Sequence, residues 1–361
     1  MHISCMKLID RLIGTLIIRV ISAPIQGEPR VPLSSCLIIR PGGIGDAVLL
    51  APVIRQLKVK YPNIQITILA ERRNAGVFAQ IPSVDLLYCY DRPAEFWHAV
   101  CGKYDVVIDT EQWHRLSAVV ARLAIAPIKI GFDTNERRRM FTHVLPYSHD
   151  DYEVDSFLRL LQPLGLDHVK ERGSLPWLKV SGEAEKEVSG RLEPVVRGPF
   201  ITLFPGASIP ERRWGADRFK AVAAELAQKG YGIVVVGGAL DLADAQTIAG
   251  ESDLNLAGKT SLAETAAVLA RSALLVSGDS GVLHIAVGLG IPTVSLFGPG
   301  RALKWAPRGE HHIVINKGLP CSPCTTFGTT PPCPCNARCM QEITVAEVVT
   351  HCLKQLEHPA G

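Results

Sequence analysis

The chain has 361 residues, of which 47% are hydrophobic and 20% are charged, and its formal net charge is +3. This length exceeds one typical hydrophobic core and favours two domains of similar size. The small net charge argues against a dedicated nucleic-acid-binding protein, and the absence of a run of about eighteen apolar residues argues against a transmembrane helix. Five of the ten cysteines crowd between Cys321 and Cys339, which favours a reduced, cytoplasmic protein over a disulfide framework.

The first element in chain order is a mixed basic and apolar stretch over residues 7–21. Arg19 interrupts its apolar run before any small-residue cleavage site, which argues against a signal peptide. Basic residues beside an apolar face are typical of a helix at a membrane surface. A helix packed on the protein itself, or a disordered extension, is the alternative. Residues 1–35 are therefore an N-terminal extension and a candidate for contact with the inner face of the cytoplasmic membrane.

Short apolar runs then alternate with helical patterns. Strands are predicted at 36–40, 64–70, 86–90, 105–109 and 129–132, and helices at 47–60, 73–80 and 115–125. This alternation is typical of a mostly parallel sheet with right-handed crossovers. Residues 36–175 are assigned to an N-terminal Rossmann-like domain. The segment from about 150 to 198, between the two strand–helix series, is predicted to be helical and polar and to carry the hinge.

A second series of the same kind begins near residue 199. Strands are predicted at 200–204, 233–236, 274–276 and 293–297, and helices at 216–229, 240–249, 261–271 and 280–289. Residues 176–342 are assigned to a C-terminal Rossmann-like domain and residues 343–361 to a closing helix and tail. The predicted fold is α/β, with two Rossmann-like domains facing a central cleft.

Three loops that follow predicted strands carry candidate chemistry. In the first domain, a glycine-rich turn leads from the strand at 36–40 to Asp46 at the ligand-binding edge of the sheet. In the second domain, one loop carries Arg212, whose guanidinium offers a fork of donors to phosphate. The other loop starts a helix at Ser280 and Gly281, whose unpaired amides suit an anion. A bound diphosphate is the predicted ligand of the second domain.

Several motifs resemble glycosyltransferase family 9, the ADP-heptose:lipopolysaccharide heptosyltransferases. They occur in one order from about residue 36 to 350, and they are Arg40-Pro41-Gly42-Gly43-Ile44-Gly45-Asp46, Gly278-Asp279-Ser280-Gly281-Val282-Leu283-His284, Phe297-Gly298-Pro299 with Trp305, and Cys321-Ser322-Pro323-Cys324. The resemblance implies the GT-B architecture, a nucleotide-sugar donor on the C-terminal domain and a lipopolysaccharide-core or glycolipid acceptor on the N-terminal one. It also implies a monomeric enzyme that inverts the anomeric centre without a metal.

The resemblance also implies residue roles. Asp46 matches the proposed general base, and Arg212 matches the residue that contacts the nucleotide phosphates and stabilises the leaving group. The other matches are donor-binding positions: Asp279, Ser280, Gly281 and His284 for the diphosphate and sugar, Ser208 for the phosphate loop, Thr260 for the base, and Asp241 or Asp244 for the ribose. The chain departs from the family pattern in having serine at 280 and Gly300-Arg301-Ala302 after the Phe-Gly-Pro motif.

Each of these residues also has a simpler interpretation. Asp46 and Asp279 both precede or begin helices, where aspartate is a favoured N-cap. His284 lies between apolar residues and is compatible with a hydrogen-bonded core histidine. The basic runs 72–73 and 137–139 are either solvated or contact acidic groups of the acceptor.

Other functions and a metal site remain open from the sequence. The glycine-rich turn at 42–45 and Glu71 suit an NAD(P)-dependent oxidoreductase, although Val48 stands in place of the third glycine of that fingerprint. A GT-B nucleotide-sugar epimerase and a catalytically idle nucleotide-sugar-binding protein are further alternatives. The cysteine cluster at 321–339 has a spacing that suits a structural zinc ion, with a reduced or partly disulfide-linked loop as the alternative.

Overall fold

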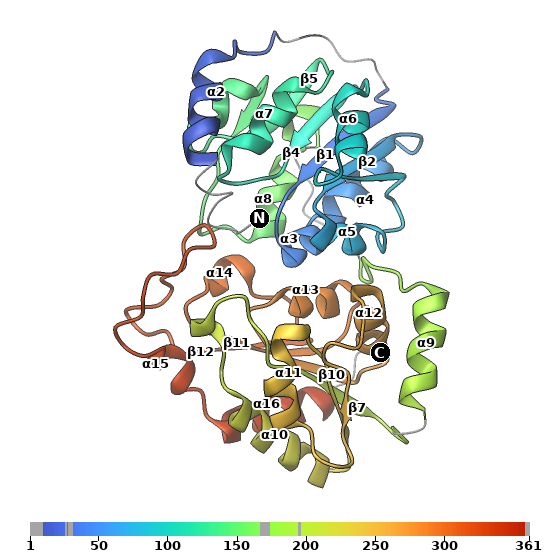
Figure 1. Cartoon of the computed structure of the whole chain (residues 1–361), viewed down its shortest axis with the longest axis vertical. Coiled ribbons are helices and arrows are strands. Elements are labelled where there is room, and N and C mark those ends of the chain that lie inside the picture. The colour runs from blue at the N-terminus through green and yellow to red at the C-terminus, as the bar shows by residue number, and fades with distance from the viewer. Residues whose placement is uncertain (1–9, 26, 28–31, 167–173, 194–195, 358–361) are drawn as a thin grey trace. The chain divides into compact units, whose positions relative to one another are not determined.

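The fold is described from a computed structural model, in which residues 10–25, 27, 32–166, 174–193 and 196–357 are described (Figure 1). The chain divides into two compact units, unit 1 (Met1–Ser174) and unit 2 (Leu175–Gly361). Each unit is built around its own parallel six-stranded sheet. Both sheets confirm the predicted α/β class.

The sheet of unit 1 has the strand order β3-β2-β1-β4-β5-β6. Its strands are β1 (Ser35–Arg40), β2 (Gln65–Ala70), β3 (Leu86–Cys89), β4 (Val106–Asp109), β5 (Ile128–Phe132) and β6 (His143–Leu145). The chain order reverses between β1 and β4, which pair in parallel. Ligands bind at such a switch point, beyond the carboxyl ends of the strands. The loops after Arg40 and Asp109 therefore meet at the edge where a site is expected.

Helices connect these strands and cover the sheet. They are η1 (Asp10–Gly14), α2 (Thr15–Val20), α3 (Ile44–Leu49), α4 (Ala51–Lys60), α5 (Arg72–Phe78), α6 (Pro93–Cys101), α7 (Arg115–Leu123), η2 (Arg137–Met140), α8 (Glu153–Arg159) and η3 (Gln162–Leu164). The predicted helix at 47–60 begins three residues earlier and is divided at Leu50. The helix predicted after residue 150 is confirmed by α8, but its predicted polar character is wrong, because Val154, Phe157 and even Glu153 are buried.

The sheet of unit 2 has the order β12-β11-β10-β7-β8-β9. Its strands are β7 (Phe200–Phe204), β8 (Gly232–Val235), β9 (Leu254–Asn255), β10 (Leu274–Gly278), β11 (Thr293–Phe297) and β12 (His312–Asn316). Strand β7 lies beside β10, and the chain order reverses there as it does in unit 1. The loops after Phe204 and Gly278, which carry Arg212 and Ser280, therefore leave neighbouring strands at one edge.

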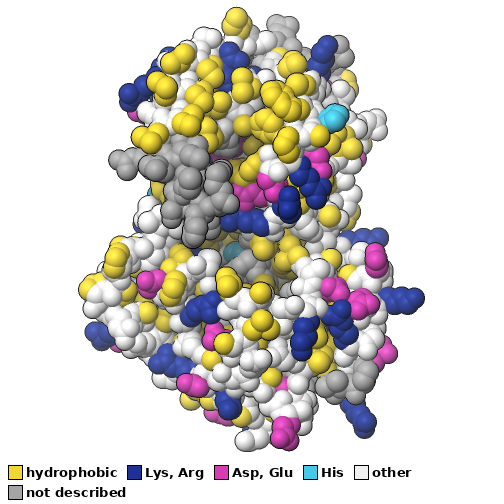
Figure 2. All heavy atoms as spheres, in the orientation of Figure 1, with side chains coloured by type: hydrophobic (Ala, Val, Ile, Leu, Met, Phe, Trp, Pro, Cys, Tyr) yellow, Lys and Arg dark blue, Asp and Glu magenta, His cyan; other side chains and the backbone are white. Residues whose placement is uncertain are grey.

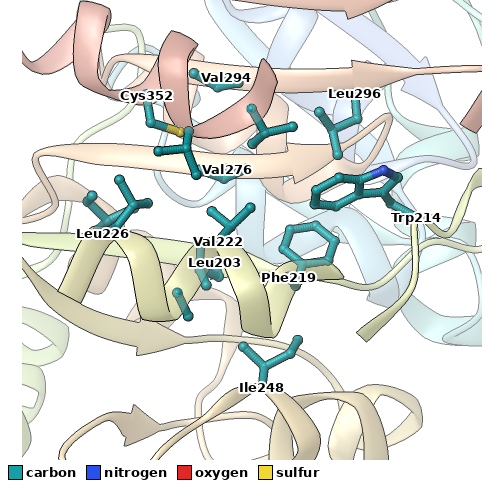
Figure 3. Packing of buried hydrophobic residues seen from close by; sticks show 14 of the residues in the cluster. Leu203, Trp214, Phe219, Val222, Leu226, Ile248, Val276, Val294, Leu296 and Cys352 are labelled. Carbon is teal, nitrogen blue, oxygen red and sulfur yellow. The ribbon is translucent and has the colours of Figure 1, made fainter. Parts of the chain in front are cut away.

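The helices of unit 2 enclose its sheet. They are α9 (Gly182–Leu192), η4 (Pro210–Arg212), α10 (Ala216–Gln228), η5 (Ala239–Asp241), α11 (Leu242–Ile248), α12 (Leu262–Ala270), α13 (Gly281–Gly288), α14 (Ala302–Trp305), α15 (Arg338–Gln341) and α16 (Val345–Glu357). Cys352 of α16 is fully buried in the same core as α10 (Figure 3), so the closing helix is part of the core of unit 2.

Trp214 anchors the loop that carries Arg212 (Figure 3). Its ring packs edge-on against Phe219, with the centroids 5.2 Å apart, and its Nε1 donates a hydrogen bond to the Ile343 carbonyl oxygen at 3.0 Å. Burying an aromatic ring of this size while satisfying its N–H fixes the loop strongly. The position of Arg212, two residues before this anchor, is thereby set by the core of unit 2.

The N-terminal extension contains η1 and α2, which pack against α7 in unit 1. The predicted helix over 7–21 is found at residues 10–20, and residues 7–9 lie outside the described part of the chain. Among the described residues, no helix is both long enough and apolar enough to cross a membrane.

Candidate active site

The glycine-rich turn of unit 1 is shaped around the Asp46 carboxylate. Gly42 has φ of +106°, a backbone conformation that other residues rarely adopt. Gly43 is the N-cap of α3, and a Cβ atom placed there would lie 2.4 Å from Asp46 Oδ2. The turn therefore needs glycine at both positions, and Oδ2 of Asp46 lies directly over it.

Asp46 is the third residue of α3 and caps nothing with its side chain, so the N-cap interpretation of this residue is wrong. Its Oδ1 atom lies 3.2 Å from Arg40 Nη2 and accepts a hydrogen bond from Gln112 Nε2 at 3.3 Å. Both contacts engage the same carboxylate oxygen. The side chain of Asp46 is consequently held in one orientation, with Oδ2 directed over the glycine turn.

Arg40 is a buried cation that organises this end of the sheet. Its Nη1 donates to the Thr110 carbonyl oxygen at 2.8 Å and to Gln112 Oε1 at 3.1 Å, and its guanidinium lies over the Phe157 ring at 5.6 Å. Burial by itself lowers the pKa of Arg40, but the charges of nearby carboxylates, led by that of Asp46, outweigh it and raise the pKa. Arg40 therefore stays charged and is a fixed partner for Asp46.

Two further residues complete the surroundings of Asp46, and the motif analysis missed both. Gln112 Nε2 also donates to Glu153 Oε1, and Tyr147 Oη donates to Glu153 Oε2 at 3.1 Å. Burial, followed by the charge of Glu153, raises the pKa of Tyr147. Gln112 follows a buried strand at the expected edge, which was a usable signal. Glu153 belongs to no motif and reaches the site only because α8 packs against α3.

In unit 2, Arg212 and Asp279 form a largely buried ion pair. Arg212 Nη1 lies 3.0 Å from Asp279 Oδ2, and the two side chains are 15% and 8% exposed. A Cβ atom at Gly300 would lie 2.1 Å from Asp279 Oδ2. The departure from the family pattern at Gly300 thus leaves the space that the Asp279 carboxylate occupies.

Ser280, and not Asp279, is the N-cap of α13, so the capping interpretation of Asp279 is wrong. The Ser280 hydroxyl accepts a hydrogen bond from the Leu283 N–H at 3.2 Å and lies 2.9 Å from the Ser277 hydroxyl. The first amides of an eight-residue helix such as α13, which starts at Gly281, are available to an anion at its positive end. The start of α13 at Gly281 is two residues after Asp279, the partner of Arg212.

His284 is buried one turn into α13, and its electrostatic partners are Asp279 and Arg212. Burial lowers the pKa of His284 to about 4; the charge of Asp279 opposes this shift, and that of Arg212 adds to it. Its Nδ1 atom has no hydrogen-bond partner among the described residues. The interpretation of His284 as a fully hydrogen-bonded core histidine therefore does not match the structure, and the ring is neutral near pH 7.

The lowered pKa of His284 predicts acid sensitivity. Unfolded His284 takes up a proton near pH 6.5, whereas folded His284 takes it up only near pH 4, so stability that is present above pH 6.5 is lost as the pH falls toward 4. Replacing His284 by Gln should reduce the loss of unfolding free energy between pH 7 and pH 4.5 by about 2 kcal/mol. Urea unfolding at the two pH values measures this loss, with exposed His98→Gln as the matched control. An equal loss of unfolding free energy in the unmodified protein, His284→Gln and His98→Gln would contradict the prediction.

Asp241 and Asp244, the two candidates for binding the ribose, lie in η5 and α11 after β8. Asp241 is wedged against Gly206 and Gly237; its Oδ1 lies 3.0 Å from Arg213 Nη2, and its Oδ2 accepts the Gly238 N–H at 3.0 Å. Asp244 also pairs with Arg213, at 2.9 Å.

Ser208 is exposed on the loop after β7, and the Thr260 hydroxyl lies 3.0 Å from that of Thr265. The structure thus brings Arg212, Asp279 and His284 together. Asp241 instead contacts Gly238 in its own loop and Arg213 in the loop after β7.

The cysteines at 321–339 converge on one cavity in unit 2. Cys321, Cys324, Cys333, Cys335 and Cys339 all line it together with Glu211. Burial, followed by the neighbouring thiols, raises the pKa of Cys324. Among the described residues, however, no group of three or more His, Cys, Asp or Glu side chains is placed to hold a metal ion. Structural zinc stays a prediction, and metal analysis of the purified protein tests it: stoichiometric zinc supports it and a zinc-free folded protein refutes it.

The basic run at 137–139 is predicted to be solvated or to contact the acceptor, and for Arg137 this prediction is wrong. Arg137 is fully buried, and its Nη2 lies 2.6 Å from the equally buried Asp109 Oδ2. Glu71, the ribose-binding candidate of the oxidoreductase alternative, accepts a hydrogen bond from Tyr90 Oη and pairs with Arg73. The carboxylates of Asp109 and Glu71 therefore both have structural partners in unit 1.

The chain is similar in sequence to known proteins. The sequence model of glycosyltransferase family 9 (heptosyltransferase) matches residues 94–333. Lipopolysaccharide heptosyltransferase 3 of Escherichia coli is 29% identical over 294 residues, which cover 74% of this chain and 85% of the relative. Lipooligosaccharide heptosyltransferase 2 of Haemophilus influenzae is 26% identical over 306 residues, covering 77% and 87%.

Solved structures share the fold. A family 9 glycosyltransferase from Veillonella parvula superposes with a TM-score of 0.76 at 21% identity, covering 90% of this chain and 97% of the other. ADP-heptose lipopolysaccharide heptosyltransferase II of E. coli superposes with a TM-score of 0.73 at 23% identity, covering 90% and 98%. These neighbours confirm the GT-B class of the α/β fold. With the family model matching well over half of its length, the chain belongs to glycosyltransferase family 9, the heptosyltransferase family.

Proposed function

We propose that this protein transfers heptose from ADP-heptose to an acceptor hydroxyl of the lipopolysaccharide core. Membership of family 9 and the names of the relatives support the reaction class. The observation that carries the mechanism is the Asp46 carboxylate, held through Oδ1 by Arg40 and Gln112 with Oδ2 over the glycine turn. A carboxylate fixed in this way is suited to take a proton in the transition state.

In the proposed reaction, the acceptor oxygen forms a bond to the anomeric carbon of the heptose as the bond from that carbon to the diphosphate oxygen breaks. The acceptor proton passes to Asp46 Oδ2, and the bonding electron pair leaves with ADP. A single displacement of this kind inverts the anomeric centre. No covalent enzyme intermediate is formed, so one base and a means of stabilising the departing ADP suffice.

Unit 2 supplies the means of stabilising ADP. The guanidinium of Arg212 and the first amides of α13 are donors that are already oriented before the reaction. Such donors stabilise developing negative charge without reorganisation. Asp279 holds Arg212 in place, and we assign the diphosphate to Arg212, Ser280 and Gly281, with neutral His284 beneath them.

The remaining donor contacts are finer proposals. Ser208 is assigned to the phosphates and Thr260 to the adenine base. Because Oδ2 of Asp241 accepts the Gly238 N–H and Oδ1 pairs with Arg213, Asp241 would contact the ribose only beside these bonds. We therefore favour a role for Asp241 in shaping the ribose-binding turn. We further propose that a monomer carries out the reaction at the inner face of the cytoplasmic membrane, because the proposed acceptor is attached to a lipid.

The test is transfer of heptose from ADP-heptose onto defined truncated lipopolysaccharide cores, with the product identified by mass spectrometry. A mass gain of one heptose on one core, with release of ADP, is the expected result. Conversion of the sugar nucleotide without an acceptor would instead indicate an epimerase. Absence of transfer to every core, with ADP still bound, would refute the proposed reaction while leaving the nucleotide site intact.

A further inference from the structure

The N-terminal helical segment has two apolar sides, and the described part of the chain covers only one of them. Gly14 is in the right-handed helical conformation, so η1 continues directly into α2. Ile18 is buried, and Ile17 and Ile21 pack against the core of unit 1. The other side is exposed: Leu12 by 62%, Ile13 by 49%, Leu16 by 65% and Val20 by 76%. A surface helix of a soluble domain has polar residues on that side.

This segment is fixed to unit 1 at both ends of α7. Asp10 Oδ1 accepts a hydrogen bond from the Leu116 N–H at 2.8 Å, and so satisfies one of the unpaired amides at the start of α7. Arg122 Nε, near the end of α7, donates to the Ser22 carbonyl oxygen at 3.0 Å. The segment therefore runs alongside α7 in the same direction and presents its exposed side as part of a fixed surface.

Two more exposed apolar side chains lie at the far end of the segment. Leu123 and Ile125 directly follow Arg122 and are 54% and 51% exposed. With them, the exposed apolar surface consists of Leu12, Ile13, Leu16, Val20, Leu123 and Ile125, which we call the α2 patch. Hydrophobic side chains gather over α2 and the neighbouring part of unit 1, at the upper left of Figure 2.

Basic side chains border the α2 patch. Arg19 lies on α2 itself and its side chain is 66% exposed, Arg122 lies at the end of α7, and exposed Lys103 pairs with Ile125 through a backbone bridge. Glu136 is the acidic residue near Arg19, at 3.6 Å, and it also pairs with Arg115. Apolar side chains with basic residues at their border match the interface of an anionic bilayer. Two copies of this surface facing each other would instead bring like charges together.

We propose that the α2 patch docks onto an anionic phospholipid bilayer. Its apolar side chains enter the boundary between headgroups and acyl chains, while Arg19, Arg122 and Lys103 contact lipid phosphates. The docking surface belongs entirely to unit 1 and involves neither Asp46 nor the nucleotide-binding residues. The inference therefore goes beyond the transferase activity and stands or falls separately from it.

The test is flotation of the full-length protein with vesicles of phosphatidylethanolamine and phosphatidylglycerol, compared with vesicles of phosphatidylcholine alone. We expect binding to the anionic vesicles that weakens as salt is raised. The double variant Leu16→Gln/Val20→Gln should lower the partition coefficient by about tenfold or more, because two apolar side chains no longer enter the bilayer. Arg19→Gln should reduce binding to anionic vesicles and make it less dependent on salt.

Val59→Gln is the matched control, because Val59 of α4 is 67% exposed in the same unit and lies outside the α2 patch. It should bind vesicles as the unmodified protein does. Equal binding by the α2-patch variant and the control would overturn the proposal. A change from dimer to monomer in the α2-patch variant, measured by light scattering without lipid, would also overturn it, because the patch would then be a contact between copies of the chain. ADP binding, measured in parallel, reports on the nucleotide site independently.

Discussion

Replacing Asp46 by Asn should lower kcat for heptose transfer by about 10²–10⁴-fold, the usual contribution of a positioned general base. Asparagine keeps the shape of the side chain and can still accept hydrogen bonds from Gln112 and Arg40 through its amide oxygen, but it cannot take the acceptor proton. Because Asp46 lies in unit 1, ADP binding to unit 2 should stay unchanged. Steady-state kinetics with a defined core acceptor, together with calorimetric titration of ADP, measures both quantities.

Gly43→Ala is an independent probe of the same carboxylate. The new Cβ atom would lie 2.4 Å from Asp46 Oδ2, so the carboxylate must move while its charge is kept. We expect kcat to fall about tenfold or more, since a small displacement of a catalytic group is costly. Thermal unfolding shows whether both variants are folded at the assay temperature, as the comparison of kcat requires. Full transfer activity in folded Asp46→Asn would show that Asp46 is not the base.

The sequence predicted best those elements whose local pattern matches their burial. Residues 36–39 of β1 are a continuous apolar run, which is typical of a strand covered on both faces, and every residue of β11 is buried. By contrast, β6 has three residues and β12 only one buried position, so neither has a recognisable pattern. α6 starts at Pro93 after a short turn and buries only Ala99 and Val100. Their structure depends on the neighbouring strands and helices more than on local sequence.

The same distinction applies to the site. Arg40 ends β1, and Asp46, Arg212 and Asp279 lie in segments that follow strands, so their place at the carboxyl ends of the strands was predictable. The contacts of Asp46 with Gln112, and of Gln112 with Glu153, join residues far apart in the chain. Such pairs follow from how α8 packs, and no spacing rule encodes them. The capping interpretations failed for a related reason, because the residue that satisfies the first amides is set by backbone geometry at the turn.

Replacing Arg212 by Gln should weaken ADP binding by about 10²–10³-fold, the loss expected when one member of a buried, charged hydrogen-bonding site is removed. Arg212→Lys should recover part of the affinity, because lysine restores the charge without the planar fork of donors. Arg213→Gln is the matched control: it removes the neighbouring guanidinium, which pairs with Asp241 and Asp244. We expect it to weaken ADP binding by less than about tenfold. Calorimetric titration of ADP measures all three variants.

A second variant separates contact with ADP from damage to the fold. Arg212→Gln leaves the Asp279 carboxylate, only 8% exposed, without its cation, and that alone destabilises the loop. Adding Asp279→Asn removes the unpaired charge, so the double variant should recover thermal stability. If Arg212 binds the diphosphate directly, ADP affinity stays low in the double variant. If affinity returns together with stability, Arg212 only balances Asp279, and the diphosphate is held by the amides at the start of α13.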